Sequence, residues 1–391
     1  MPDILRFDPE ARYDCTSCGL CCSGDLAVHA TTAEKLHMEQ LPWDTLPDAE
    51  RVEPRFDRVG GDLWKLPKQG DDPPRCIYLL DDASCVIHKH WGPAAKPAMC
   101  RRFPFQHVAS DEAVWVSVCF GCPGVAGGAG RPLEDHREDL ASIFDAPLAE
   151  ASGTEGVHYP LTPDVRLPDP EVQAAFNTVL AGMGADVFGA MSQLAAFAAA
   201  APAPGEPQPA ARPADASEIP SQLRFAFALT LYRDAVDASS FLGRLGAVVT
   251  LPRMLAFGHS YRSRLLDIDV DMAAVLSHPG TLPAESSALL AQVLRSRLHG
   301  RLVFSHVPSA VSGISRSLLE LCVVLYLARA LAMGRSIQHD DVLRALEVVE
   351  LHISSQTRAG SVARLDPRLA KAWADPTVAM AAAQLFTPVE G

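Results

Sequence analysis

The chain lacks a surplus of basic residues, a basic leader and a long uncharged apolar run, and each absence excludes a class of protein. Its net charge is −13, so we expect no general surface for nucleic acid or for an anionic membrane. The first residues, MPDILRFDPEARYD, have neither the basic nor the apolar segment of a secretory signal. The most apolar stretch, 317–333, carries Glu320 and Arg329 and is short for a membrane span. We therefore expect a cytoplasmic protein.

Several enzyme motifs are missing as well. The sequence has no phosphate-binding Gly-Lys-Ser/Thr loop, no G-x-S-x-G elbow and no H-E-x-x-H zinc-protease helix. The glycine-rich segment 125–130 stands outside any βαβ pattern, so we interpret it as a loop and not as a nucleotide site. The alternating aspartates of 267–271 lack the glycine and glutamate that a calcium loop needs. The composition, 48% hydrophobic and 21% charged, is that of a globular protein long enough for two or three domains.

What the chain does have is clustered cysteine. Thiolates at two-residue spacing repel one another and oxidise unless a metal ion or an iron–sulfur cluster holds them. Because cytoplasmic thiols stay reduced, metal binding is favoured over disulfides. Nine of the ten cysteines precede residue 123 and are the candidate metal ligands, and the first four follow the pattern C-x2-C-x2-C-C: Cys15, Cys18, Cys21, Cys22, Cys76, Cys85, Cys100, Cys119 and Cys122. The tenth, Cys322, lies in an apolar run and is expected in the core.

Spacing alone leaves the metal open. The run C-x2-C-x2-C matches the first three ligands of bacterial ferredoxin-type clusters, and Cys122-Pro123 has the form of their fourth. Paired C-x2-C motifs equally suit a tetrahedral zinc ion. In an extended segment Cys22 would point away from Cys21, so we expect it to face a second site or the core. Nine cysteines also divide into two groups of four with one left over, which makes two metal sites a hypothesis.

Basic side chains accompany the cysteines. Arg101 and Arg102 follow Cys100 directly, and their guanidinium groups could stabilise a thiolate cluster or bind a carboxylate or phosphate of a cofactor. Surface ion pairs are the alternative interpretation. His88 and His90 are weaker candidate ligands than the cysteines.

Three regions differ in composition, and together they predict an α+β, mostly α fold. Residues 1–124 should form a small cysteine-rich, metal-stapled domain, with a strand at 114–118 and a hairpin of 76–80 and 85–87. Residues 125–216 should form an irregular connection, one helix that starts at Asp169 and continues through Leu194, and an Ala/Pro linker at 198–216. Residues 217–391 should be an all-helical domain, with the central buried helix at 318–327 and helices at 219–238, 240–257, 283–299, 309–334, 338–356 and 367–385.

The order of the cysteine segments resembles a known family. The segments CTSCGLCC (15–22), CIYLLDDASCVIHKHWGPAAKPAMCRRFPF (76–105) and CFGCPG (119–124) resemble the YkgJ-type CxxCxxCC cysteine-cluster family, described as a zinc- or iron-chelating domain. With its helical C-terminal half, including 294–304 and 340–354, the chain also looks like the flagellin lysine N-methylases (FliB-type), which are iron–sulfur proteins.

These resemblances imply a function and its cofactors. They favour a 4Fe-4S iron–sulfur cluster over zinc, and they imply an S-adenosylmethionine-dependent protein lysine N-methyltransferase whose protein substrate is of the flagellin kind. They imply no particular catalytic residue. The alternative hypothesis is a non-catalytic zinc- or iron-binding module for metal handling, redox sensing or structural stabilisation.

Overall fold

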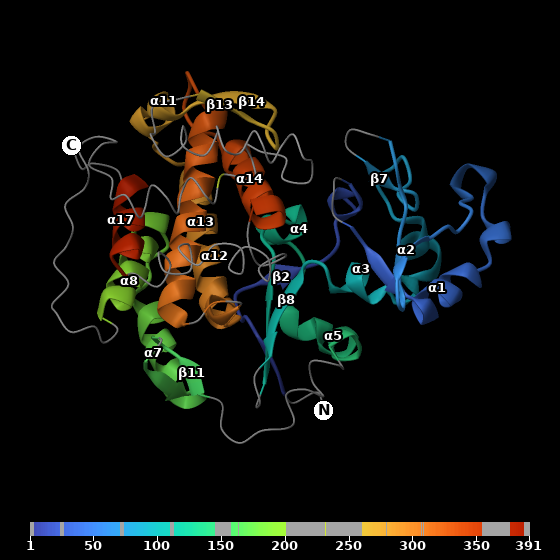
Figure 1. The fold of residues 1–391 in the computed structure, drawn as a ribbon, viewed down its shortest axis with the longest axis horizontal. Coiled ribbons are helices and arrows are strands. Elements are labelled where there is room, and N and C mark those ends of the chain that lie inside the picture. The colour runs from blue at the N-terminus through green and yellow to red at the C-terminus, as the bar shows by residue number, and fades with distance from the viewer. Residues whose placement is uncertain are drawn as a thin grey trace.

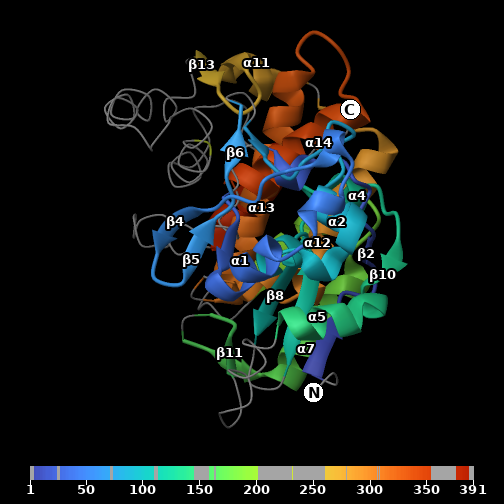
Figure 2. The same ribbon diagram turned by 90° about the vertical axis from the view of Figure 1, so that its right-hand side faces the viewer.

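A computed structural model of the chain describes residues 4–23, 27–70, 74–109, 113–144, 158–162, 164–200, 231, 260–278, 280–305, 307, 309–353 and 376–386. Helices predominate over short strands, which confirms the α+β, mostly α fold class. The long helices stand together on one side, the small N-terminal elements lie on the other, and strand β8 runs between them (Figure 1). Figure 2 shows the same arrangement from the N-terminal side.

A three-stranded sheet occupies the middle of the molecule. Its order is β1 (Leu5–Phe7), β9 (Val114–Val118), β8 (Phe105–Ala109), with β1 parallel and β8 antiparallel to β9. The strand predicted at 114–118 is therefore confirmed. The hydroxyl of Ser117 on β9 lies 2.6 Å from that of Ser296 on helix α12 (Ala284–His299), and both residues are buried. The sheet thus packs directly on the helices and belongs to the larger hydrophobic core.

The cysteine-rich segment also has a core of its own. Its buried members include Met38, Trp43, Tyr78 and Ile87, and they form a cluster separate from the large one. The predicted hairpin is a tight turn: Leu79 and Cys85 form an antiparallel bridge, after which the chain enters a helix. The elements of this part and of the connection that follows are β2 (Arg12–Tyr13), η2 (Leu20–Cys22), β3 (His29–Thr31), α1 (Thr32–Glu39), β4 (Asp57–Gly60), β5 (Leu63–Lys65), β6 (Lys68–Gln69), β7 (Arg75–Cys76), α2 (Val86–Trp91), α3 (Ala98–Arg102), α4 (Pro123–Ala126), β10 (Arg131–Pro132) and α5 (Arg137–Ile143).

The helix predicted from Asp169 through Leu194 is two helices. Strands β11 (His158–Pro160) and β12 (Arg166–Pro168) lead into α7 (Asp169–Gly182), and α8 (Val187–Ala200) follows. Gly182 and Gly184 flank the break, and the carboxylate of Asp186 accepts a hydrogen bond from the backbone N–H of Gly189 at the start of α8. Two glycines and a capping aspartate disfavour continuous helix, although the apolar spacing runs through them.

The C-terminal helices follow the predicted spacing closely. Helix α12 matches the expectation for 283–299, α13 (Ala310–Leu331) that for 309–334, and α14 (His339–Val348) continues into the π-helical turn η8 (Val349–Ile353). By length and composition α13 alone among the described helices could cross a membrane, yet it is buried by the helices around it. It is the central core helix that the sequence predicts, and Cys322 lies within it, fully buried.

The C-terminal region departs from an all-helical one at a single described hairpin. Strands β13 (Ser260–Ser263) and β14 (Ile268–Asp271) pair antiparallel and lead into α11 (Met272–Ser277). Of the alternating aspartates, Asp269 and Asp271 lie in β14 and Asp267 precedes it. Arg262 on β13 pairs with Asp267 and Asp269. Helix α17 (Pro376–Phe386) covers part of the helix expected at 367–385. The linker beyond Ala200 and the helices expected at 219–238 and 240–257 lie outside the described residues, apart from Leu231. The boundaries at 124 and 216 stay predictions.

The contact between the sheet and α12 predicts a steric test. A methyl group added at Gly300, which follows α12, would collide with the buried side chain of Ser117. We expect Gly300→Ala to lower the free energy of unfolding by about 1–3 kcal/mol, since overpacked cores cost that much. Gly184→Ala is the matched control, because Gly184 is exposed and its added methyl group would meet only the side chain of Asp186 and the backbone nitrogen of that residue. Urea denaturation measures both, and equal stabilities would contradict the packing described.

Candidate metal centre

The first cysteine run forms a tightly turned loop. Ser17 and Gly19 adopt positive φ values of 53° and 72°, and the 3-10 turn η2 begins directly after Gly19. A Cβ on Gly19 would lie 3.2 Å from that of Ala83 and 3.3 Å from the Leu79 side chain. The loop is therefore seated on the turn that connects Leu79 with Cys85. Glycine is suited to this position by its φ angle and by the close approach.

Cys22 does not point away from Cys21. The two sulfur atoms lie 3.8 Å apart, because residues 20–22 form a 3-10 turn and not the extended segment that the prediction assumed. Two thiolates bound at about 2.3 Å to one tetrahedral ion stand about 3.8 Å apart, so this distance suits shared or adjacent ligation. The prediction of opposite directions was wrong for this structural reason.

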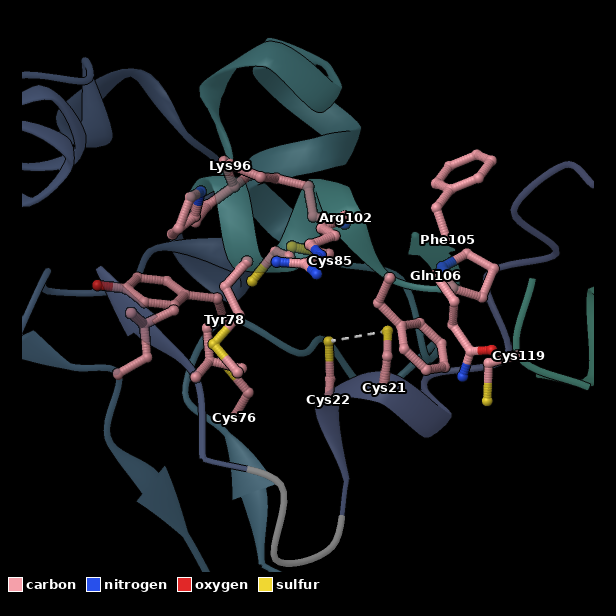
Figure 3. A pocket seen from close by; sticks show the side chains of 18 of the residues that line it. Cys21, Cys22, Cys76, Tyr78, Cys85, Lys96, Arg102, Phe105, Gln106 and Cys119 are labelled. Atoms are coloured by element: carbon pink, nitrogen blue, oxygen red, sulfur yellow. Dashed lines mark hydrogen bonds between the residues drawn. The ribbon is translucent and has the colours of Figure 1, made fainter. Parts of the chain in front are cut away.

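Six cysteines line one cavity of about 350 Å³, which we call the inner cavity. They reach it from η2, β7, the turn before α2, α3 and the residue after β9. Figure 3 shows Cys76 toward one end of this cavity, Cys119 at the other, and Cys21 and Cys22 between them. The six are Cys21, Cys22, Cys76, Cys85, Cys100 and Cys119.

A second cavity of about 470 Å³, the outer cavity, lies on the other side of the first loop. It is lined by Cys15, Cys18, Cys21, Cys100 and Cys122, together with residues of α5. Cys21 and Cys100 thus border both cavities. Cys15 and Cys18 are exposed, whereas Cys122 is buried. The nine predicted ligands are all placed around these two spaces.

The residues fit a thiophilic metal by their chemistry. Within the described segments, no three histidine, cysteine, aspartate or glutamate side chains stand close enough to hold one ion as the structure has them. The thiol groups nevertheless face common cavities, and thiolates are the ligands that zinc and iron–sulfur centres take. Binding an ion requires these side chains to close on it by rotation.

The thiols perturb one another strongly. The contact with Cys22 lowers the pKa of Cys21 to about 6, and the same contact, with burial, raises the pKa of Cys22 far above its usual range. Either sulfur can donate in their 3.8 Å contact. Burial raises the pKa values of Cys76 and Cys122 to about 11 and also raises that of Cys100. Buried thiols of this kind ionise when a metal binds.

Lys96 is the residue that the sequence analysis missed. It lines both cavities. Burial opposes its charge, but the thiolates of Cys85 and Cys100 prevail and raise the pKa of Lys96. A half-buried ammonium group that borders both cavities can offset the negative charge of the thiolates. The only sequence signal was its position between the cysteine segments.

The two arginines predicted to bind a cofactor face different cavities. Arg101 lines the outer cavity, and its buried Nε has no hydrogen-bond partner. Arg102 lines the inner cavity and donates a 2.6 Å hydrogen bond to Nδ1 of His107. Their cofactor-binding role stays a prediction. Among the two candidate histidines, His88 lines the outer cavity, whereas His90 contacts the Glu50 carboxylate at 2.6 Å.

Cys119 lines the inner cavity but also faces a carboxylate. Burial and the carboxylate of Glu350 raise the pKa of Cys119 well above its usual value. A Cβ on Gly121 would lie 3.0 Å from that of Glu350 and 2.9 Å from Leu351, so the turn Cys119–Cys122 is packed against η8. A thiol that faces a buried carboxylate is poorly placed for an anionic metal centre.

His107 predicts a pH dependence of stability. Burial and the adjacent Arg102 lower the pKa of His107 to about 4, against about 6.5 in an unfolded chain. Between pH 4 and pH 6.5, His107 therefore binds a proton in the unfolded state but not in the folded state. We expect the contribution of His107 to the free energy of unfolding to be constant above pH 6.5. Toward pH 4 it should fall by about 1–2 kcal/mol, allowing for solvent screening.

Substitution isolates this contribution. His107→Gln should flatten the dependence between pH 6.5 and 4, measured by urea denaturation at each pH, while His37→Gln on the exposed side of α1 should leave it unchanged. An identical slope in the His107 variant and the parent chain would contradict the assignment.

Comparison with known protein families finds one similarity, over part of the chain. Residues 14–120 match the model of the family CxxCxxCC, described as "Putative zinc- or iron-chelating domain". The match includes eight of the nine predicted ligands and ends two residues before Cys122. No curated protein and no solved structure matches the chain.

Proposed function

We propose, on the premise that residues 14–120 are a domain of the CxxCxxCC family, that the chain binds zinc or iron through the cysteines of the inner cavity. The observation that carries this proposal is the convergence of Cys22, Cys76, Cys85 and Cys100 on one cavity from four separate segments. We call these four residues the inner cysteine group. Four thiolates complete a tetrahedral site for zinc or iron.

Charge balance supports the proposal. Four thiolates around a divalent ion leave two net negative charges. Lys96 and Lys68 both line the inner cavity, and the negative charges of the thiolates raise the pKa of Lys96. Cations at this position lower the cost of burying the anionic centre.

The proposed role of the metal is to hold the small core together. Among the described residues, the smaller hydrophobic cluster contains thirteen buried ones, and the strands near it are two to four residues long. A core of this size contributes little net stability on its own. A metal that joins η2, β7, α2 and α3 would close several loops of this segment at once.

Metal analysis tests the proposal. The full chain is purified anaerobically, and its zinc and iron are measured by mass spectrometry. We expect at least one tightly bound ion, lost when Cys76 and Cys85 are both changed to serine. Cys322→Ser is the control, because that cysteine is buried in α13 and lines neither cavity. A double variant with unchanged metal content would refute the inner site.

Lysine methylation remains a separate hypothesis that rests on sequence resemblance alone. It requires S-adenosylmethionine, a protein substrate such as flagellin, and catalytic groups that have not been assigned to residues. Methyl transfer from S-adenosylmethionine to flagellin by the metal-loaded chain is the experiment that decides it. The metal-binding proposal stands or falls independently of that result.

A further inference from the structure

We infer that the chain has a second metal centre, an iron–sulfur cluster held by Cys15, Cys18, Cys21 and Cys122 at the outer cavity. We call these four residues the outer cysteine group. The inference goes beyond the family match, because Cys122 lies outside the matched residues 14–120. It also goes beyond the inner site, with which it shares no ligand.

The fold brings Cys122 to the first loop by close backbone contacts. Strand β2 pairs with β10, so the segments before Cys15 and after Cys122 run side by side. A Cβ on Gly124 would lie 2.9 Å from the carbonyl oxygen of Asp14, and one on Gly130 would collide with the backbone of Tyr13 and Asp14. These two glycines permit an approach that any side chain would obstruct.

The electrostatic neighbours agree with this grouping. The charges that act on Cys122 include those of Cys18 and Cys21, and those that act on Tyr13 are Cys15, Cys122 and Cys21. The thiolate charges that act on Cys100 are those of Cys76 and Cys85 of the inner group and also that of Cys21. Cys21 therefore acts on thiols of both groups, in keeping with its position at the border of the two cavities.

The number of thiols decides the place of Cys21. If Cys21 joined the inner group, that group would contain five thiols and the outer one three. A tetrahedral ion takes four ligands, and a 4Fe-4S cluster takes four cysteines. With Cys21 in the outer cysteine group and Cys22 in the inner one, each centre has four thiols. Both cysteines lie in the 3-10 turn η2, where Cys21 borders both cavities and Cys22 borders the inner one.

The ligand pattern favours a cluster over a single ion at the outer site. Cys15, Cys18 and Cys21 have the two-residue spacing of a ferredoxin-type loop, and the fold supplies the fourth cysteine with proline after it, as Cys122-Pro123. The cavity of about 470 Å³ is larger than the inner one. The charged residues that border it are Lys96, Arg101, Arg131, Asp14, Glu138 and Asp139, and Arg131 pairs with Asp14. Lys96 is the cation on which the thiolates act directly, and such a group favours an anionic cluster.

Reconstitution with equal amounts of ferric and ferrous iron and with sulfide under anaerobic conditions tests the inference on the full chain. We expect about four sulfides per chain with the matching visible absorbance. Cys122→Ser and Cys18→Ser should each lose most of that sulfide while the metal of the inner group is retained. Cys18 is exposed, so its variant keeps the test valid even if loss of the buried Cys122 disturbs folding.

Two further variants separate the inference from the proposed function. Cys119→Ser, in the same turn as Cys122, should retain the sulfide, and Cys76→Ser should lose the inner ion alone. Full sulfide content in the Cys18 and Cys122 variants would overturn the outer cluster and leave the inner site standing. Loss of sulfide from Cys76→Ser or Cys119→Ser would overturn the division into two centres.

Discussion

Removal of the metal should unfold the small core and leave the helices intact. Structural zinc in small domains contributes about 10–16 kcal/mol of binding free energy, which becomes folding free energy when the apo segment has little core. The smaller cluster depends on thirteen buried residues, whereas the large core extends through α12, α13 and α14. The loss of stability should therefore be local.

Hydrogen exchange measured by mass spectrometry distinguishes the two regions. After treatment with a strong chelator, amides of 27–109 should exchange far faster, with the exception of β8 in the central sheet. Amides of α13 should keep their protection, because that helix is buried along its length. If the amides of the small core were equally protected with and without metal, the metal would not hold that core together. If the amides of α13 lost their protection at the same time, the unfolding would not be local.

Replacing Arg297 with leucine should cost about 3–5 kcal/mol of stability, the usual effect of removing one partner from a buried ion pair. Arg297 on α12 contacts Glu320 of α13 at 2.9 Å and Glu350 of η8 at 2.6 Å. Its side chain is 6% exposed, and those of the two glutamates are 4% exposed. Without Arg297, both carboxylates would remain in the core with much of their compensating charge removed.

A matched control lies on the same helix. Arg295 makes a 2.8 Å ion pair with Glu10, but that pair is partly exposed to solvent. Arg295→Leu should therefore cost about 1 kcal/mol or less. The stabilities of the two variants are compared by thermal and urea denaturation. If the Arg297 variant were as stable as the Arg295 variant, the buried ion pairs of Arg297 would not stabilise the fold as described.

The ion pairs of Arg297 also connect to the cysteine-rich segment through Glu350. Glu350 contacts Arg297 on one side and raises the pKa of the Cys119 thiol on the other. The turn Cys119–Cys122 therefore packs against η8 at its start, and Cys122 at its end lines the outer cavity. This contact distinguishes the surroundings of Cys119 from those of Cys122, although their C-x2-C spacing alone suggests one shared ion.

Local patterns predicted the elements that depend on nearby residues. The strand at 114–118, helices α12 to α14 and the buried α13 follow directly from apolar periodicity. The same periodicity passed over the break after Gly182, because apolar spacing carries no information on the glycines between α7 and α8. The predicted opposite directions of the Cys21 and Cys22 side chains were wrong, because the prediction assumed extended backbone where a 3-10 turn forms.

The distribution of the cysteines depended on tertiary contacts that the sequence does not display. Spacing identified the thiols and allowed for two groups of four, but it did not distinguish the surroundings of Cys119 from those of Cys122. Only the packing of Gly121 on Glu350 and of Gly124 on Asp14 shows that these two neighbours face different surroundings. Lys96 was missed for a related reason, since its importance comes from the thiols that surround it in space.

X-ray absorption at the zinc and iron edges tests most directly whether the cysteines hold the metal. On anaerobically purified full-length chain, the account predicts a first shell of sulfur at about 2.3 Å for each metal present, with no light-atom ligands. After reconstitution with iron and sulfide, the iron edge should add iron neighbours that disappear in Cys18→Ser. A first shell of nitrogen or oxygen, or a chain that binds neither metal, would contradict the account.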